Sequence, residues 1–308
     1  MSEPVLVMHA VTKWFGDVVA VSDVTTTLHP GVTGLLGPNG AGKSSLMRMA
    51  CGLAAPSTGT VRLFGVDPRT NPQVFRRVGL VPQSEALPGG TPTDLVRIAA
   101  LLHGVLDPGA ATEQALSRVG LHEQKDRPLR QMSGGERQRA KIAQALVHDP
   151  ELLVMDEPLE GLDPRQRNAV IDLITRLGAE GRSVLVSSHV LEEVERMLAE
   201  TDEVIVVTRG RLVAQGDVRG VRELMDDRPH RVRLTVDDPR RLAAVLAQMF
   251  HVKRLELGEN CLTLETTDLR ALGRELIPAV RQAGCRLTEM IPLDDDLDSV
   301  FRYLVATP

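Results

Sequence analysis

The chain has 308 residues, a length that favours about two domains. Its hydrophobic content of 43% and charged content of 25% are ordinary for a globular protein, and its formal net charge of −5 gives no support for nucleic-acid binding through bulk electrostatics. No uncharged run approaches the ~18–20 residues that a membrane-spanning helix needs, and the N-terminal stretch lacks the pattern of a signal peptide.

Short apolar segments cover residues 5–8, 18–21 and 24–28, and a polar turn at residues 13–17 interrupts them. Segments of this length and composition are typical of β-strands. They predict a small antiparallel β subdomain that leads into the next strand.

That next strand ends at Leu36, and a glycine-rich loop and a helical pattern follow it. The loop reads Gly37, Pro38, Asn39, Gly40, Ala41, Gly42, Lys43, Ser44. Its glycines let backbone N–H groups converge on an anion, and the start of the helix adds partial positive charge at the same point. Lys43 can neutralise terminal phosphates, and the Ser44 hydroxyl can hold their magnesium ion. A plain turn before a core helix would not explain this pair, so the loop predicts a nucleotide site.

Trp14 and Phe15 lie in the polar turn, although only 2% of the residues are aromatic. Either ring could stack on the adenine of a nucleotide or fill the core of the hairpin. Sequence position does not decide between these readings.

The pattern after residue 57 predicts an α/β domain with an inserted helical part. Residues 57–66 read as a hairpin, 78–81 as a short buried strand, and 93–146 as a block of amphipathic helices. Strand patterns at 152–155 and 184–187 enclose a helix at 165–177, and a hairpin follows at 203–214. This β-α-β order predicts a parallel core sheet with helices on its faces and a helical subdomain.

Polar residues follow three of these strands. Asp156 and Glu157 come directly after the strand 152–155, Gln83 follows 78–81, and His189 follows 184–187. Open α/β sheets bind ligands at the carboxyl ends of their strands, so neighbouring strands would bring these groups to the phosphates. Asp156 fits the magnesium ion, whereas Glu157 points in another direction and is predicted to orient or deprotonate the attacking water.

Ser133 and Glu136 are spaced as a capping box ahead of an apolar helical stripe. A well-capped helix would explain this pair and nothing more. The intervening Gly134 and Gly135, however, are poor helix formers that cost about 1 kcal/mol each relative to alanine. They indicate backbone that must approach something closely, such as a phosphate at the helix N-terminus.

The composition becomes polar near residues 222–230, which predicts a domain boundary and hence domains at 1–228 and 229–308. Beyond it, strand patterns occur at 232–236, 252–257, 261–266 and 286–290, and helical spacing at 242–249 and from Asp268 onward. Pro278 should kink or end the second helix, and residues 294–303 read as a short closing helix. The β-α-β-β-α-β order predicts a small ferredoxin-like α+β domain, without a catalytic motif, that braces a dimer or senses a ligand.

Taken together, the motifs resemble those of an ATP-binding cassette (ABC) ATPase, the cytoplasmic motor subunit of a membrane transporter. The segment GPNGAGKSS resembles the Walker A loop, LLVMDEP Walker B, MSGGERQR the signature, GLDP the D-loop and SSHVLEEVE the switch-histidine segment, while Gln83 matches the Q-loop. The resemblance covers about residues 4–228. TKWFG is similar to the adenine-stacking turn, whose aromatic residue precedes the glycine, which favours Phe15 over Trp14. The tail LDDDLDSVFRYL is similar, more weakly, to the end of a small C-terminal domain on drug- and antibiotic-export ATPases.

The resemblance implies a P-loop ABC fold and two MgATP molecules buried between two head-to-tail copies of the chain. The implied nucleotide-binding residues are Phe15, Gly37, Pro38, Asn39, Gly40, Ala41, Gly42, Lys43, Ser44 and Ser45. The implied metal-binding residues are Ser44, Gln83 and Asp156, and the implied catalytic residues are Glu157, His189, Gln83 and Lys43. From the other copy would come the signature residues Ser133, Gly134, Gly135 and Glu136, with Asp163 of the D-loop linking the two sites.

Some positions depart from the commonest family pattern. Met132 replaces a leucine before the signature serine, and Glu136 stands where many members have glutamine. Leu159 and Glu160 replace a more usual Thr-Asn or Thr-Ser, and Glu160 adds negative charge near the expected dimer seam. None of these changes removes a catalytic group.

The function implied is an ATP-hydrolysing transporter subunit, with export favoured by the tail, in which dimer closure acts on a separate transmembrane permease. Such a chain would lie at the cytoplasmic face of the cell membrane and bind no nucleic acid. Its three widely spaced cysteines fit a reducing cytoplasm. The alternative is a soluble ABC-type ATPase acting on ribosomes or DNA. Proteins of that kind carry two cassettes, long coiled coils or zinc modules, whereas this sequence has one phosphate loop and no sustained heptads.

Overall fold

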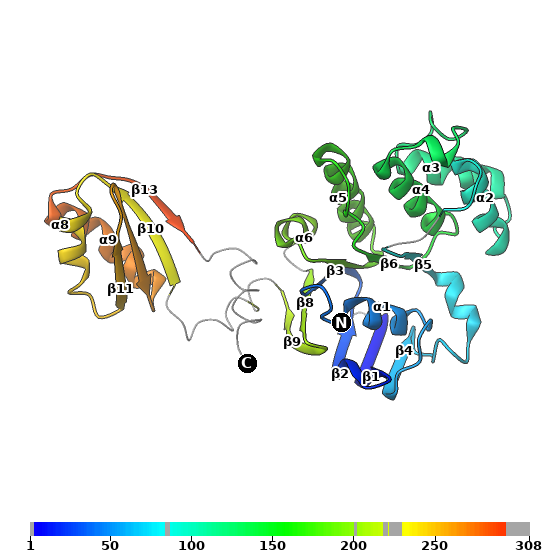
Figure 1. Cartoon of the computed structure of the whole chain (residues 1–308), viewed down its shortest axis with the longest axis horizontal. Coiled ribbons are helices and arrows are strands. Elements are labelled where there is room, and N and C mark those ends of the chain that lie inside the picture. Colours follow the sequence, from blue (N-terminus) through cyan, green and yellow to red (C-terminus); the bar gives the residue numbers. More distant parts are fainter. Residues whose placement is uncertain (1–2, 84–86, 200–201, 218–220, 222–229, 294–308) are drawn as a thin grey trace. The chain divides into compact units, whose positions relative to one another are not determined.

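Figure 1 shows the chain in a computed structural model that describes residues 3–83, 87–199, 202–217, 221 and 230–293. The chain divides into two compact units, Met1–Asp217 and Val218–Pro308. The boundary expected at residue 228 and the closing helix expected at 294–303 lie outside the described residues.

An antiparallel sheet with strand order β2-β1-β4 forms the first part of the N-terminal unit. Its strands are β1 (Leu6–Phe15), β2 (Val18–Leu28) and β4 (Thr58–Leu63). The turn expected at residues 13–17 is wrong in extent, because only Gly16 and Asp17 lie between the two strands. Register shifts along the β1–β2 ladder, typical of bulges, let both strands continue through their polar positions.

The hairpin expected at residues 57–66 is also wrong. These residues form the single strand β4, which pairs with β1 and closes with one bridge between Leu63 and Val66. Val61 and Leu63 are buried in the same apolar cluster as Leu6 and Met8 of β1. Pairing with β1 therefore buries the apolar side chains of β4, which a local hairpin would not achieve.

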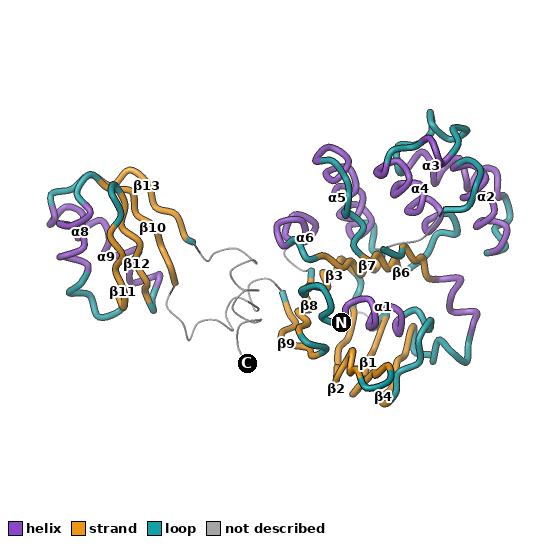
Figure 2. Tube along the Cα trace, viewed as in Figure 1, coloured by secondary structure: helices purple, strands orange, loops and turns teal. Residues whose placement is uncertain are grey.

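The core of the unit is a six-stranded sheet with order β5-β6-β7-β3-β8-β9 (Figure 2). The strands are β3 (Gly31–Leu36), β5 (Val78–Val81), β6 (Leu152–Asp156), β7 (Ser183–Ser188), β8 (Glu203–Thr208) and β9 (Arg211–Gly216). All neighbours pair in parallel except β9, which is antiparallel to β8. Every residue of β6 and β7 is buried, as expected of parallel strands covered on both faces. The predicted parallel core sheet is confirmed.

Helices cover the core sheet and build the inserted subdomain. Figure 1 shows α5 (Pro164–Ala179) and α6 (Leu191–Met197) on one side of the sheet and α1 (Lys43–Ala50) on the other. The helical subdomain contains α2 (Pro92–Leu102), α3 (Pro108–Arg118) and α4 (Gly134–Leu146), and short 3₁₀ turns lie at Pro72–Arg77 and Leu129–Gln131. Its buried side chains are continuous with the cluster beneath α5, so the subdomain shares a core with the sheet.

The C-terminal unit has the element order β10 (His230–Val236), α8 (Pro239–Leu246), β11 (Val252–Leu257), β12 (Cys261–Thr266), α9 (Leu269–Ala283), β13 (Leu287–Pro292). Its antiparallel sheet has the order β11-β12-β10-β13. Val232, Leu234 and Val236 alternate into a core of its own. Pro278 does not end α9, which continues for five residues beyond it, with Ala279 and Val280 buried against the sheet.

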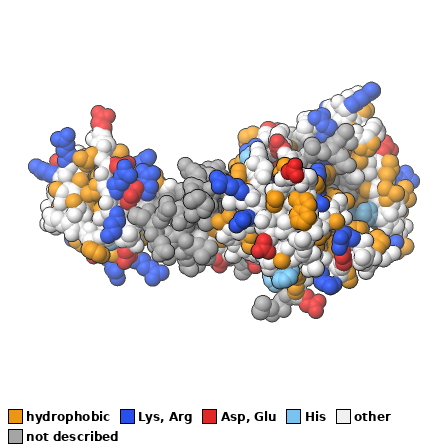
Figure 3. All heavy atoms as spheres, turned by 60° about the horizontal axis from the view of Figure 1, so that its bottom comes forward, with side chains coloured by type: hydrophobic (Ala, Val, Ile, Leu, Met, Phe, Trp, Pro, Cys, Tyr) orange, Lys and Arg blue, Asp and Glu red, His pale blue; other side chains and the backbone are white. Residues whose placement is uncertain are grey.

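On the face of the molecule drawn in Figure 3, cationic and anionic side chains are interspersed with apolar ones. Among the described residues, no helix combines the length and the apolar character needed to span a bilayer.

Candidate nucleotide site

The loop between β3 and α1 needs glycine at defined positions. A Cβ atom on Gly37 would lie 2.3 Å from the Val207 carbonyl oxygen, and one on Gly42 would lie 2.5 Å from that of Ala20. Gly42 also has φ 102°, in the region that only glycine adopts readily. The loop lines a cavity of about 390 Å³, whose wall consists of Ala20, Pro38, Asn39, Gly40, Ala41, Gly42, Lys43, Ser44, Ser45, Gln83, Asp156, Glu157, Glu160 and His189.

Lys43 begins α1 and is buried, with 6% of its side chain exposed. Its Nζ atom donates to the Gly37 carbonyl oxygen at 2.6 Å and lies 3.3 Å from Glu157 Oε1. The ammonium group therefore sits inside the curve of the loop, where successive N–H groups and a helix N-terminus favour an anion.

Asp156 ends β6, and Glu157 follows it in a strained conformation. The φ of Glu157 is 49°, which is rare for a residue with a side chain. Ser187, at the end of the neighbouring β7, fixes both residues: its hydroxyl donates to Asp156 Oδ1 at 2.6 Å and accepts from the Glu157 N–H at 2.9 Å. Backbone strain at a position held by a buried hydrogen bond is typical of functional sites.

The Glu157 carboxylate lies between a cation and an imidazole. Its Oε2 atom is 2.9 Å from His189 Nδ1, and its Oε1 atom faces Lys43 without a hydrogen bond from any described residue. Only 7% of the side chain is exposed. A buried carboxylate oxygen with a free lone pair at the mouth of a phosphate loop can accept a proton or a hydrogen bond from a bound water.

Gln83 lies two residues beyond β5 and is exposed. Its Nε2 atom donates to Glu160 Oε2 at 3.0 Å. The structure thus brings Gln83, Asp156, Glu157 and His189 from three adjacent strand ends to one cavity. Glu160 departs from the family pattern, and no local sequence pattern predicts its contact with Gln83.

Trp14 and Phe15 are both exposed, at 45% and 52%, so neither fills the hairpin core. Lys13 places its Nζ atom 4.8 Å from the Phe15 ring centroid. Neither ring lines the phosphate cavity, where Ala20 forms the wall on the side of β2. Both rings remain accessible to a base.

The signature segment is not part of the same cavity. Ser133 caps α4: its hydroxyl accepts from the Glu136 N–H at 3.2 Å, and the Glu136 carboxylate accepts from the Ser133 N–H at 2.7 Å. The bond from the Ser133 N–H, together with Arg127, keeps the pKa of Glu136 below its usual value. Asp163 caps α5 in the same way, accepting from the Gln166 N–H at 2.9 Å. Ser133, Gly134, Gly135, Glu136 and Asp163 are therefore ordered in one chain without meeting its own phosphate loop.

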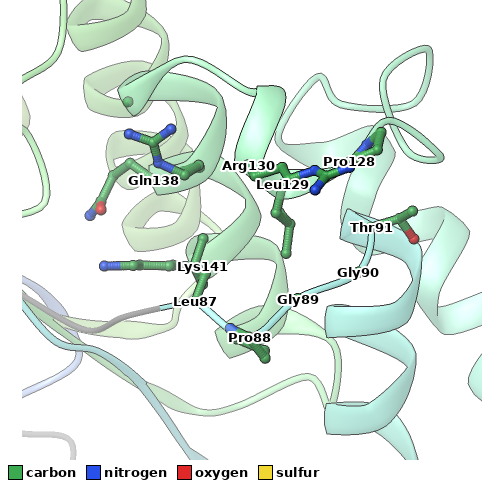
Figure 4. Close-up of a pocket in the computed structure, with 12 residues that line it drawn as sticks. Leu87, Pro88, Gly89, Gly90, Thr91, Pro128, Leu129, Arg130, Gln138 and Lys141 are labelled. Carbon is green, nitrogen blue, oxygen red and sulfur yellow. The ribbon is translucent and has the colours of Figure 1, made fainter.

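A larger pocket of about 800 Å³ lies between α4 and residues 87–91 (Figure 4). Its described lining contains the cations Arg130, Arg137 and Lys141 and no carboxylate. It lacks the strained backbone and the acid–base groups of the smaller cavity. The smaller cavity is therefore the candidate reaction site.

Comparison with known proteins finds a family and named relatives that this chain resembles. The profile of the ABC transporter family matches residues 21–160. Nod factor export ATP-binding protein I of Cupriavidus metallidurans is 38% identical over 217 residues, 69% of this chain and 71% of that protein. The bacitracin transport ATP-binding protein of Enterococcus faecalis is 30% identical over 307 residues, 98% of this chain and 97% of that protein.

Solved structures share the fold of the N-terminal unit. The ATP-binding subunit of an ABC transporter superimposes with a TM-score of 0.65 and 26% identity, over 72% of this chain and 93% of that one. A dimeric ATP-binding cassette in a post-hydrolysis state, bound to ADP and Pi, gives a TM-score of 0.64 and 22% identity, over 70% of this chain and 99% of that one.

Proposed function

This chain belongs to the ABC transporter family as an ATP-binding subunit, and we propose that it hydrolyses MgATP at the Gly37–Ser45 loop with Glu157 as the general base. The observation that carries this assignment is the buried, strained Glu157, whose Oε1 atom accepts no hydrogen bond from the described residues. The relatives are transport and export ATPases, which gives no support to the alternative of action on ribosomes or DNA.

ATP binding would exchange the partners of Lys43. The Lys43 ammonium contacts the Gly37 carbonyl oxygen and the Glu157 carboxylate, and phosphate oxygens are stronger partners than a carbonyl. Their arrival would draw Lys43 toward the γ-phosphate and free Glu157 to face the water. Phe15, half exposed on the rim of the unit, would stack on the adenine.

The residues around the loop fit a magnesium ion. The Ser44 hydroxyl, the Gln83 amide oxygen and the Asp156 carboxylate are the hard oxygen donors that this ion prefers, and phosphate oxygens and water usually complete its shell. Asp156 would act through the oxygen that Ser187 does not occupy. Bound there, the ion would neutralise charge on the β- and γ-phosphates. Positioning by this chain's own residues would supply the rest of the catalysis.

His189 would hold Glu157 and also contact the γ-phosphate. Its Nδ1 atom lies 2.9 Å from the Glu157 carboxylate, and the imidazole itself is 45% exposed toward the cavity. A ring held at one nitrogen leaves the other for a ligand oxygen. His189 would thus keep the base oriented and contact the phosphate at the same time.

A second copy, arranged head to tail, would complete the site with Ser133, Gly134, Gly135 and Glu136. Gly134 supports this arrangement, because a Cβ atom there would meet nothing closer than the Gly161 carbonyl oxygen at 3.8 Å. The isolated chain has room for a side chain, so its own packing does not require glycine at this position. A nucleotide pressed against the N-terminus of α4 would require it.

The chain would work at the cytoplasmic face of the membrane as an exporter motor, coupled to a separate permease. The pocket in Figure 4 supports a contact with the permease, because residues 87–91 and the signature helix α4 both line it. Its cations Arg130, Arg137 and Lys141 fit an acidic segment of the permease. The C-terminal unit, with the strand order of a ferredoxin-like module, would brace or regulate the dimer.

Replacement of Glu157 by glutamine tests the assignment. Glu157→Gln should leave ATP affinity intact but lower kcat by at least about 100-fold, since loss of a general base typically costs 10²–10⁴-fold. It should also accumulate an ATP-bound dimer, because binding still closes the interface and hydrolysis no longer opens it. Phosphate release and size-exclusion chromatography with MgATP measure the two effects.

Glu160→Gln is the matched control. Glu160 lines the same cavity and carries the same charge, but it bonds to Gln83 rather than to Lys43 and His189. It should retain most of the turnover. Wild-type hydrolysis by Glu157→Gln would refute the role given to Glu157.

The permease contact is tested by charge reversal on the larger pocket. The double variant Arg130→Glu/Lys141→Glu should keep the ATPase rate of the isolated subunit and lose co-purification with the permease. Both residues lie outside the phosphate cavity, so the isolated activity has no reason to change. Unchanged co-purification would contradict this surface.

A further inference from the structure

One partly buried ion pair of the N-terminal unit has no part in the proposed reaction. Arg167, on the first turn of α5, places its Nε atom 2.9 Å from Glu193 Oε1 on α6. The Glu193 side chain is only 8% exposed, and that of Arg167 is 36% exposed. A carboxylate buried to this degree needs a partner, and removing the partner of such a pair is far more disruptive than losing a surface ion pair.

Each member of the pair also contacts a residue that precedes a predicted functional residue. The Arg167 guanidinium donates through Nη2 to the carbonyl oxygen of Leu162, the residue before Asp163. The Glu193 carboxylate lies 3.4 Å from the hydroxyl of Ser188, the residue before His189. That hydroxyl in turn accepts from the Val190 N–H at 3.0 Å, so the backbone on both sides of His189 is tied to Ser188.

Glu193 lies within electrostatic reach of the reaction site. Burial raises its pKa, Arg167, Ser188 and His189 oppose that rise, and the negative charge of Glu157 adds to it. The carboxylate therefore responds to the charges of both groups that flank the proposed attacking water.

We propose that Arg167 and Glu193 form a positioning pair that couples the D-loop to the switch histidine within one chain. The connection runs from the Leu162 carbonyl through Arg167, Glu193 and Ser188 to His189, whose ring holds Glu157. This inference rests on the proposed function, since it assumes that Asp163 meets the partner copy. A displacement of Asp163 by the partner would then move His189 and Glu157, so that hydrolysis starts only in the closed dimer.

Removal of charge from the pair should affect turnover and leave binding unchanged. Glu193→Gln and Arg167→Gln should each lower kcat by about 10–100-fold, because small misplacements of catalytic groups have effects of this size. The dissociation constant for ATP should stay at the wild-type value, because neither residue lines the phosphate cavity. Glu180→Gln is the matched control: Glu180 also joins α5 to arginines, Arg118 and Arg182, but at the opposite end of the helix. It should keep the wild-type kcat.

A double-mutant cycle with Asp163→Ala separates coupling from mere support of the fold. If the pair transmits the position of Asp163, the double variant Asp163→Ala/Glu193→Gln should be no slower than the slower single variant. Additive losses in kcat would overturn the proposal, as would wild-type kcat in Glu193→Gln. Should Glu193→Gln fail to fold, Arg167→Met/Glu193→Leu replaces the pair with apolar groups, a change that buried ion pairs often tolerate. Wild-type kcat in that variant would equally overturn the proposal.

The outcomes also distinguish this proposal from the proposed function. Wild-type protein without MgATP hydrolysis, or active Glu157→Gln, would refute the function itself. An active wild type with an inactive Glu157→Gln leaves the function standing, and the cycle then tests the pair alone.

Discussion

Among the individual residues of the site, Glu157 has the least common backbone conformation. Glu157 follows β6 with φ 49°, and the Ser187 hydroxyl holds its N–H from the next strand. A non-glycine residue in this region costs of order 1–3 kcal/mol, which the surrounding contacts must offset. The Asp156 carboxylate accepts from Ser187, whereas that of Glu157 faces Lys43 and His189, so the two neighbouring carboxylates have different partners.

Replacement of Gly134 by alanine separates folding from function. Gly134→Ala should melt at or slightly above the wild-type temperature, because the site has room for a methyl group and alanine loses less backbone entropy, worth about 0.4–1 kcal/mol. The same variant should lose most ATPase activity, because the methyl group would face the partner's nucleotide. Calorimetry and phosphate release measure the two properties.

Gly42→Ala is the control variant in which folding and activity should be lost together. Its backbone has φ 102° and its new Cβ would lie 2.5 Å from the Ala20 carbonyl oxygen, so this variant should lose stability as well as activity. A stable Gly134→Ala with wild-type turnover would count against a nucleotide at the N-terminus of α4.

The sequence predicted the site residues that lie next to the end of a strand. Asp156, Glu157 and Lys43 follow recognisable strands or loops, so their arrival at one cavity follows from the parallel sheet. The contact between Arg167 and Glu193, and that between Gln83 and Glu160, could not be predicted. The first contact depends on how α5 packs against α6, and the second joins the end of β5 to the loop between β6 and α5, so neither follows from a local sequence pattern.

At the scale of the element, the ends of α2 and α4 meet β5 through two histidines. His103 caps the C-terminus of α2, and His148 follows α4, with ring centroids 3.7 Å apart and planes at 9°. The His148 Nε2 atom lies 2.9 Å from the Val78 carbonyl oxygen of β5. The stacked pair thus joins the helical subdomain to the core sheet.

This junction should make the fold sensitive to acid. Burial, and to a smaller extent the charge of His103, lowers the pKa of His148 from 6.5 to about 4. Below pH 6.5 the unfolded chain therefore binds a proton that the folded chain does not, and stability is lost as the pH falls from about 6.5 toward 4. His148→Phe keeps a stacked ring that cannot titrate, so its melting temperature should fall less between pH 7 and pH 5 than that of the wild type.

The comparison is made on slopes, because His148→Phe also loses the contact with Val78 and should start from a lower melting temperature at pH 7. Equal slopes for His148→Phe and wild type would show that the histidine stack is not the acid-sensitive junction.

Element prediction failed where apolar patterns admit more than one pairing. Residues 57–66 alternate as a hairpin does, yet Val61 and Leu63 are buried against β1, where their partners Met8 and Leu6 lie more than fifty residues earlier in the chain. Local periodicity indicates that a strand exists but not which strand it pairs with. At Pro278, packing likewise outweighs the low helix propensity of proline, since α9 continues past it with Ala279 and Val280 in the core.

At the scale of the whole molecule, the two units have separate cores. The C-terminal sheet buries Val232, Leu234 and Val236 on one face, whereas Arg231 and Arg233 alternate to the other. Ion pairs of Arg231 with Glu256 and Glu265 make that second face polar. The sequence predicted the order of these elements from the alternation of the strands and the spacing of the helices. The boundary at residue 228 stays a prediction, because it lies outside the described residues.

Because the two units have separate cores, we expect two unfolding transitions. Nucleotide should raise the melting temperature of only one of them, that of the N-terminal unit. All residues of the phosphate cavity belong to the unit Met1–Asp217. A ligand that binds only the folded state stabilises it by RT ln(1 + [L]/Kd), about 2.7 kcal/mol at 100 times Kd. MgATP, measured in the Glu157→Gln background so that it is not consumed, should therefore raise the melting temperature of the N-terminal unit and leave the C-terminal transition in place. Adding Lys43→Ala should abolish the shift, because the ammonium group that meets the phosphates is gone. The dependence on protein concentration distinguishes the two roles predicted for the C-terminal unit. If the unit braces a dimer, its melting temperature should rise with the protein concentration; if it senses a ligand, its melting temperature should not. A single transition that moves entirely with MgATP would contradict independent unfolding of the two units.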